Sequence, residues 1–344
     1  MLIRAAPAPS SINLNPDSRQ TMIKHLFATV LMTFSAAAFA VPFGSQSVLV
    51  VENDTGKILL EKNADTVVPI ASLTKLMTAM VVLDAKLDMN EQIEIDRDDV
   101  DRVKFSSSRV PVGASISRSD VLHLALMSSD NRAAAALART YPGGNEAFKA
   151  AVRRKIRALG MTQTTIEEPT GLSPHNRSTA GDLVKMAVAS VRYPDIVRMT
   201  TETKEMIDIN GRGVEYHNTN RLVGAKGWDI GLSKTGYTNE AGRCLIMNIT
   251  AAGKKATLVL LNAGASSARV LDALNIRRFM TGDAAPVARV ARAARVSSGG
   301  PRIKASAGSV KAKAKARTKL VKSKVQATKN RKVAKVKTTR KRRD

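Results

Sequence analysis

A serine and a lysine, Ser72 and Lys75, begin the apolar run SLTKLM and could act as a nucleophile and its base. On a helix, residues i and i+3 lie about one turn apart on the same side, so the two side chains would be neighbours. A serine hydroxyl attacks a carbonyl only when a base takes its proton, and a lysine can be that base only when burial or a nearby cation lowers its pKa. The alternative is an N-cap serine beside a surface lysine.

Two further motifs follow in the chain, Ser129-Asp130-Asn131 and Lys234-Thr235-Gly236. An S-x-x-K pattern arises by chance roughly once or twice in a chain of this length, whereas each tripeptide is expected about 0.1 times or less. Taken singly, the first tripeptide fits a helix-capping turn and the second a strand end with a turn glycine. One copy of each motif, in this order, indicates that the three belong to one active site.

The ordered triple resembles the active-site motifs of penicillin-binding proteins and serine β-lactamases. Segments around it, such as LMSSDNRAAAALARTYPGG and EPTGLSPHNRSTAGDLVKM, are similar to the low-molecular-mass DD-peptidases, in particular to the D-alanyl-D-alanine endopeptidase type. The similarity covers roughly residues 45–281. It implies an α/β fold of the α+β kind, in which helices flank a five-stranded antiparallel sheet and a helical lobe is inserted.

The resemblance also implies roles for the motif residues. Ser72 would attack the carbonyl of the penultimate D-alanine of a peptidoglycan stem peptide, with Lys75 as general base. Ser129 would relay a proton to the leaving amine, and Asn131 would hold the amide backbone of the substrate. β-Lactam antibiotics would be covalent inhibitors.

The third motif would bind the far side of the substrate. Lys234 would attract the substrate carboxylate and help to keep Lys75 neutral. Thr235 would offer its hydroxyl to the same carboxylate, and Gly236 would let the strand approach the ligand closely.

Two further assignments follow from the resemblance. The backbone N–H groups of Ser72, at a helix start, and of Tyr237 would form the oxyanion hole. Arg269 offers a second cation for the carboxylate, and it fits equally well as an exposed charge on a helix.

No cofactor or metal is expected. We interpret His123 as a structural histidine on a buried helix, and we place His175 and His217 in polar loops. The lone cysteine, Cys244, rules out an intrachain disulfide and fits a small buried hydrophobe.

The residue pattern predicts that both ends of the chain body contribute strands to one sheet. A hairpin is expected around the turn Asp54-Thr55-Gly56, and helices are expected between it and the C-terminal strands. The expected helices are 73–83, 119–139, 145–159, 182–190 and 267–280, and the expected later strands are 230–235, 243–249 and 256–261.

Composition divides the chain into three parts. Residues 1–40 read as a leader and an export signal that starts at Met22 and is cleaved after Ala40, which predicts a periplasmic protein without a transmembrane helix in the mature chain. Residues 41–283 are the catalytic domain. Residues 284–344 hold 21 Lys and Arg against one acid and no aromatic residue, and we predict a disordered tail.

The tail sets up the hypothesis of another class, a polycationic binding protein. Export argues against nucleic acid as its partner, and anionic groups of the wall or of lipopolysaccharide fit a diffuse polycation. A solubilising tail without a partner is equally compatible.

Two enzyme alternatives also stay open. A β-lactamase needs a carboxylate that activates the deacylating water, usually Glu followed by Leu-Asn, and this chain has EEPTGL at 167–172 instead. A D-Ala-D-Ala carboxypeptidase is harder to separate from an endopeptidase, because both cut after a D-alanine and beside a carboxylate.

Overall fold

The computed structural model describes residues 43–283, so the predicted leader, the cleavage site after Ala40 and the basic tail lie outside the described residues. Within this range no helix is both long and apolar enough to cross a membrane.

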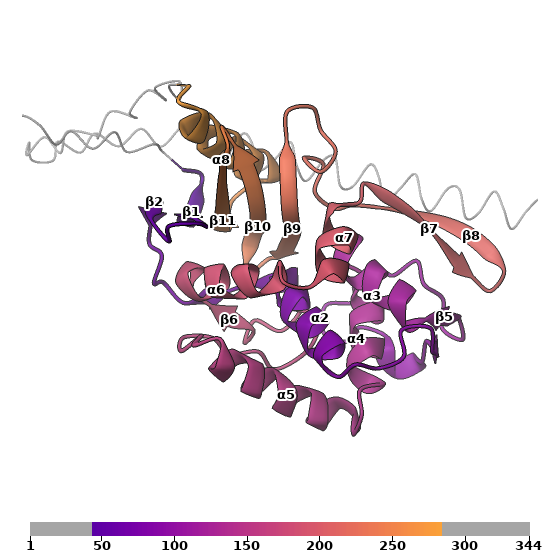
Figure 1. Ribbon diagram of the computed structural model, residues 1–344. Helices are drawn as coiled ribbons and strands as arrows, with labels where there is room; N and C mark the ends of the chain where they lie inside the picture. The colour runs from indigo at the N-terminus through magenta and orange to yellow at the C-terminus, as the bar shows by residue number, and fades with distance from the viewer. Residues whose placement is uncertain (1–42, 284–344) are drawn as a thin grey trace, which may run out of the picture. The chain divides into compact units, whose positions relative to one another are not determined.

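Strands from both ends of this range form one five-stranded antiparallel sheet, as predicted (Figure 1). β1 (Ser45–Glu52) and β2 (Ile58–Lys62) are the N-terminal hairpin, followed much later by β9 (Asp229–Thr238), β10 (Gly242–Ala251) and β11 (Lys254–Ala263). The order across the sheet is β2-β1-β11-β10-β9. β1 therefore pairs with a strand from the far end of the described chain, and β9 is an edge strand.

Helices cover both faces of the sheet. α8 (Ser266–Thr281) packs against β1, β10 and β11, while α6 (Ala180–Ser190) contacts the same three strands and belongs to the larger core on the other face. Successive residues of a strand point to opposite faces. Val48 and Val50 accordingly share a core with Ile276 of α8, whereas Leu49 belongs to the larger core that includes Leu183 of α6.

The inserted lobe lies between β2 and β9 in the sequence, and α2 (Thr74–Asp84) runs through its centre. Every residue of α2 from Thr74 to Val82 is buried, and the helix contacts five others. The other helices of the lobe are α3 (Arg118–Met127), α4 (Asn131–Arg139), α5 (Gly144–Ala158) and α7 (Pro194–Thr201). Its short elements are η1 (Ala71–Leu73), η2 (Arg97–Asp99), the paired β3 (Val68–Pro69) and β6 (Arg177–Ser178), and the paired β4 (Gln92–Glu94) and β5 (Ser115–Ser117).

The single helix expected over 119–139 is wrong, since the structure divides it into α3 and α4. Ser129 between them has φ of +61°, which no continuous helix allows. The carboxylate of Asp130 then caps α4 by accepting a hydrogen bond of 2.9 Å from the N–H of Ala133. The motif at 129–131 thus forms a sharp turn.

A hairpin of β7 (Lys204–Ile209) and β8 (Arg212–His217) is absent from the sequence prediction. Its turn is Asn210-Gly211, with φ of +55° and +77°, and this dipeptide is a strong signal for a two-residue hairpin loop. His217 is consequently the last residue of β8. The placement of His217 in a polar loop is therefore wrong.

The first prediction concerns Asp272 of α8, which fixes the start of β1. Its carboxylate accepts hydrogen bonds from the N–H of Gly44 (2.9 Å) and from the N–H and hydroxyl of Ser45 (2.7 Å each), and the residue is 2% exposed. Asp272→Ala leaves buried donors without an acceptor, so we expect the free energy of unfolding to fall by about 2–4 kcal/mol. Urea unfolding measures the loss, with the exposed Asp229→Ala as control; equal losses in both variants would contradict the prediction.

Candidate active site

Ser72 lies in η1, immediately before α2. It is not an N-cap, because neither η1 nor α2 begins with a side-chain capping hydrogen bond. The preceding residue, Ala71, has φ of +48°, a conformation that side chains rarely adopt. Gly171 packs directly on this segment, and a Cβ there would lie 2.0 Å from the carbonyl oxygen of Ala71. The backbone beside the serine is therefore held in place from a distant part of the chain.

Lys75 is 1% exposed, which excludes the surface-lysine alternative. Its Nζ lies 3.0 Å from Oγ of Ser72, 2.7 Å from Oδ1 of Asn131 and 2.7 Å from the carbonyl oxygen of Thr170. The last two oxygens can only accept hydrogen bonds, and a neutral amine has two N–H groups to give them. Its lone pair is then left facing the Ser72 hydroxyl.

The turn between α3 and α4 carries the second motif. Asp130 points away from the lysine, where it caps α4 and accepts a hydrogen bond of 2.7 Å from the hydroxyl of Ser108. Asn131 accepts from Lys75 and donates through Nδ2 to Oγ of Ser106 at 2.9 Å. The aspartate thus shapes the turn, while the serine and asparagine on either side of it point to the site.

The third motif lies on the edge strand β9. Nζ of Lys234 donates to Oγ of Ser129 at 2.8 Å, so the structure joins the second and third motifs directly. Lys234 is 1% exposed. A Cβ on Gly236 would lie 3.1 Å from the backbone nitrogen of Ser72, closer than nearly all real contacts of this kind. Glycine therefore fits where β9 passes the serine, and a larger residue would require the Ser72 segment to shift.

Burial sets the protonation of the two lysines. It lowers the pKa of Lys75 to about 8, although nearby carboxylates, chiefly Glu168, raise it. Burial also holds the pKa of Lys234 well below its usual value, and the positive charges of Lys75 and Arg269 lower it further. Two buried amines so close together favour sharing one charge over carrying two.

Arg269, Cys244 and Tyr237 are the remaining residues that the sequence singled out, and their exposure differs. Arg269 is mostly buried on α8 and donates from Nη1 to the carbonyl of Cys244 at 3.0 Å, so the exposed-charge alternative is wrong. Cys244 is buried, as expected. The side chain of Tyr237 is 48% exposed and stacks on Arg243, whose guanidinium carbon lies 3.5 Å from the ring centre. Only the backbone of Tyr237 is thus available for the proposed oxyanion hole.

Glu168 stabilises the loop that supplies the carbonyl of Thr170, and no sequence motif marked it for this role. Both of its carboxylate oxygens accept hydrogen bonds. The donors are the N–H groups of Thr170 (2.8 Å), Gly171 (2.6 Å) and Ser173 (3.3 Å), the Thr170 hydroxyl (2.5 Å) and the side-chain amide of Asn176 (2.9 Å). A carboxylate engaged in this way is not free to activate a water molecule. Glu168 of the EEPTGL segment therefore stabilises the conformation of the loop.

Thr219 is a second residue that sequence reasoning missed. Its Oγ1 lies 2.7 Å from Oγ1 of Thr235, and its N–H donates to the carbonyl of Met127 at 3.1 Å. It thus links the end of α3 to β9. No motif marks it, because it follows β8 in a polar segment that resembles an ordinary loop.

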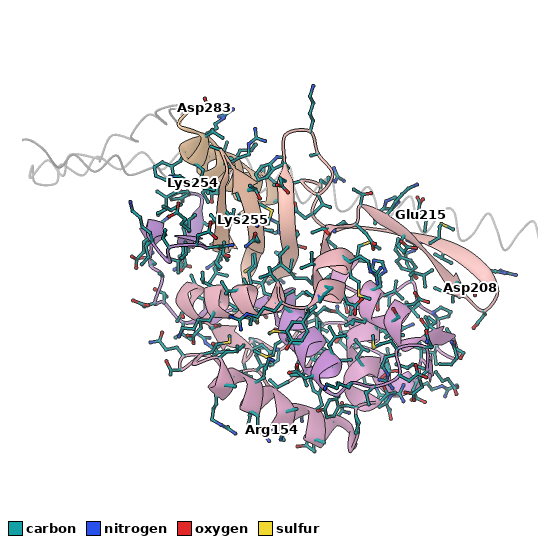
Figure 2. The ribbon with its side chains drawn as sticks, viewed as in Figure 1. Arg154, Asp208, Glu215, Lys254, Lys255 and Asp283 are labelled. Carbon is teal, nitrogen blue, oxygen red and sulfur yellow. The ribbon has the colours of Figure 1, made fainter. Side chains whose placement is uncertain are left out.

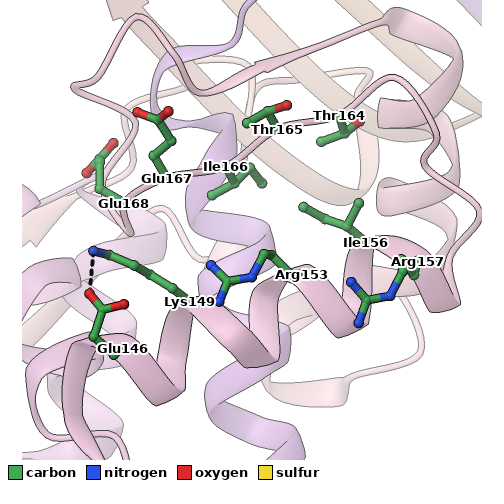
Figure 3. A pocket seen from close by; sticks show the side chains of 10 residues that line it. All are labelled: Glu146, Lys149, Arg153, Ile156, Arg157, Thr164, Thr165, Ile166, Glu167 and Glu168. Atoms are coloured by element: carbon green, nitrogen blue, oxygen red, sulfur yellow. Dashed lines mark hydrogen bonds and ion pairs between the residues drawn. The ribbon is translucent and has the colours of Figure 1, made fainter.

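Two clefts continue from the motif residues along α5. One has a volume of about 490 Å³ and is lined by Asn131 and Thr170, the two partners of Lys75. It shares Glu146, Lys149 and Glu168 with the second cleft, of about 740 Å³. In the second cleft, Lys149, Arg153 and Arg157 of α5 face the segment 164–168 (Figure 3). Lys149 pairs with Glu146 at 2.8 Å, and neither arginine has an ion-pair partner within residues 43–283.

Known proteins with similar sequences are cell-wall peptidases. The D-alanyl-D-alanine carboxypeptidase family matches residues 33–265. A D-alanyl-D-alanine endopeptidase of Pseudomonas aeruginosa is 47% identical over 255 residues, which cover 73% of this chain and 82% of that protein. A second one, from Escherichia coli, is 43% identical over 262 residues, which cover 75% and 84%.

Solved structures agree with the fold predicted from the motifs. A Streptomyces DD-transpeptidase superposes with a TM-score of 0.65 at 26% identity, covering 70% of this chain and 98% of that one. A penicillin-binding protein of Listeria monocytogenes in its ampicillin-bound form gives a TM-score of 0.61 at 28% identity, covering 70% and 98%. The matched residues include all three motifs, and the chain belongs to the D-alanyl-D-alanine carboxypeptidase family of serine DD-peptidases.

Proposed function

We propose that this serine DD-peptidase is a periplasmic endopeptidase that hydrolyses D-alanyl-diaminopimelate cross-links of peptidoglycan through an acyl-enzyme on Ser72. The observation that carries the chemistry is the distance of 3.0 Å between Nζ of Lys75 and Oγ of Ser72, at which the neutral amine can take the hydroxyl proton. The two relatives that are 47% and 43% identical bear the endopeptidase name, and the export signal predicted from the sequence of residues 22–40 supports the periplasm.

Acylation begins when Lys75 takes the hydroxyl proton of Ser72 and Oγ bonds to the carbonyl carbon of D-alanine. Negative charge moves to the carbonyl oxygen, where the N–H groups of Ser72 and Tyr237 would stabilise it. The C–N bond then breaks, and the leaving amine receives a proton through the Ser129 hydroxyl, which Lys234 holds at 2.8 Å. Water attacks the resulting ester with Lys75 again as base and releases the serine.

Substrate binding would use the free edge of β9. An extended peptide can pair with an exposed strand edge, and β9 ends the sheet beside Ser72. The carboxylate of the leaving residue would meet Lys234 and the hydroxyl of Thr235, with Arg269 adding positive charge from behind the strand. Asn131 would hold the amide backbone on the opposite side.

Penicillin would acylate the same serine, as the ampicillin-bound relative from Listeria suggests. A β-lactamase is the weaker alternative, because it needs a carboxylate that activates the deacylating water. The carboxylate of Glu168 already accepts hydrogen bonds from the loop, and EEPTGL contains no asparagine. A D-Ala-D-Ala carboxypeptidase remains the closest alternative, since the family carries that description.

The second prediction separates these activities. Purified residues 41–344 are incubated with a mixture of cross-linked muropeptide dimers and pentapeptide monomers, and the products are identified by mass spectrometry. We expect dimers to become monomers while pentapeptides keep their terminal D-alanine, and we expect Ser72→Ala to abolish the conversion. Loss of terminal D-alanine alone would make the chain a carboxypeptidase.

The third prediction follows from the protonation of Lys75. The neutral amine is the reactive base, and a pKa of about 8 leaves most of it protonated at lower pH. The rate constant for acylation by a fluorescent penicillin should therefore rise about tenfold per pH unit below 8 and level off above it. A rate that is constant from pH 6 to pH 9, or a Lys75→Ala variant that is acylated as fast as the unmodified chain, would contradict this mechanism.

The fourth prediction concerns the cleft of about 740 Å³ that is lined by Lys149, Arg153 and Arg157, here called the basic cleft. We expect it to bind carboxylates of the stem peptide beyond the bond that is cut. Removing Arg153 and Arg157 together takes away two exposed cations, each contributing up to about 1 kcal/mol. KM for cross-linked dimers should rise about fivefold to tenfold with kcat unchanged.

Arg154→Ala is the matched control. Arg154 also lies on α5 (Figure 2) and is next to Arg153 in the sequence, but it lines a different cleft. Acylation of Ser72 by penicillin should be the same in all three proteins, because no residue of the three motifs lines the basic cleft. A KM that rises equally in the control, or in neither, would exclude the cleft from substrate binding.

A further inference from the structure

A cluster of three potential metal ligands lies outside the active site, where α3 meets the segment that joins α7 to β7. His123 belongs to α3, Glu202 follows α7, and Glu205 lies in β7. One ligand atom from each side chain can be chosen so that all three lie within 4.8 Å of one another. Residues far apart in the sequence thus bring one imidazole and two carboxylates to a single point.

The two central atoms of this cluster lie in close contact but form no hydrogen bond. The side chain of His123 is 4% exposed, and its Nε2 lies 2.8 Å from Oε2 of Glu202. Neither atom makes a well-directed hydrogen bond to any residue within 43–283. A buried polar atom without a hydrogen bond is costly, and when Nε2 carries no proton its lone pair is repelled by the carboxylate oxygen. A cation held between the two atoms would remove both penalties.

We propose that His123, Glu202 and Glu205 bind a divalent transition-metal ion of the zinc class, which ties α3 to α7 and β7. Imidazole and carboxylate are common zinc ligands, and three of them leave a fourth position for water. Zinc bonds of about 2.0–2.2 Å separate tetrahedral ligand atoms by about 3.3–3.6 Å, so Nε2 and Oε2 would move apart by roughly half an ångström.

The charges around the cluster favour a cation. Asp120, also on α3, adds a third carboxylate whose field reaches His123. The opposing charge is Arg198 of α7, whose guanidinium lies 3.4 Å from Oε1 of Glu202 and 3.6 Å from Asp195. It therefore pairs with the carboxylate oxygen that faces away from His123, and it leaves Oε2 for the ion.

The position of the cluster gives the ion a structural role for the peptidase. α3 ends at Met127, directly before the turn that carries Ser129. The chain beyond the β7–β8 hairpin returns to Thr219, which bonds to Met127 and to Thr235 of β9. An ion that joins α3 to β7 would therefore fix the position of the helix whose end Thr219 connects to β9 near the reaction centre.

The test is a titration of purified, metal-free residues 41–344 with Co²⁺, whose visible d–d absorption reports ligand geometry, followed by displacement with Zn²⁺. We expect absorption that saturates at one ion per chain and a melting temperature that rises by a few degrees with excess zinc. His123→Gln and Glu202→Gln should lose both effects.

Glu215→Gln is the matched control. Glu215 and His217 form another His–Glu pair, 3.2 Å apart, in which His217 is exposed and Glu215 is partly exposed. Glu215 lies on the β7–β8 hairpin (Figure 2). This variant should bind cobalt as the unmodified chain does. Acylation of Ser72 by penicillin confirms that each variant is folded. If one variant does not fold, Glu205→Gln is used in its place, because Glu205 is only partly buried.

Three results would overturn the proposal. They are no cobalt absorption in the unmodified chain, absorption that survives His123→Gln and Glu202→Gln, and absorption lost only in Glu215→Gln. In the first case, His123 and Glu202 share a proton and form an ordinary buried pair. Because the readouts are spectral and thermal, they are independent of the endopeptidase assignment.

Discussion

The whole site depends on one buried amine, Nζ of Lys75. An amine removed from water must have hydrogen-bond partners, and a catalytic one must also keep its lone pair free for the nucleophile. The protein meets both conditions with two pure acceptors, Oδ1 of Asn131 and the carbonyl oxygen of Thr170. These come from the start of α4 and from the loop before β6. Three separately folded segments must therefore meet at one atom before the serine can react.

The loop that supplies Thr170 shows a conflict between geometry and charge. Glu168 shapes the loop through five hydrogen bonds, yet its negative charge raises the pKa of Lys75 and so opposes catalysis. Burial of the lysine outweighs this effect, and the result is a pKa of about 8. The glutamate is tolerated beside the base because its charge is already shared among backbone and side-chain donors.

The sequence alone was sufficient for the sheet and the motifs but not for the supporting contacts. Continuous apolar runs mark β1, β10 and β11, and the three motifs mark residues whose chemistry is rare in combination. The break at Ser129 was missed because ALMSSDNRAAAALA has helical character on both sides, and only a tertiary contact selects the positive φ. Thr219 connects segments that are remote in the sequence, and Glu168 acts through the conformation of one loop; neither leaves a periodic or compositional signal.

The edge strand β9 explains why both chain ends must fold before a site exists. Lys234 reaches Ser129 only if β9 has the correct position relative to the helical lobe. On one side β9 pairs with β10, which pairs with β11, and β11 in turn pairs with β1. On its free side, Gly236 contacts the Ser72 segment and Thr219 joins the strand to α3. Sheet and lobe share an apolar core and pack together through α6, and the catalytic residues add a polar connection between them. A substrate that binds along β9 therefore bridges both parts of the fold, and its binding energy can stabilise the arrangement that the reaction requires.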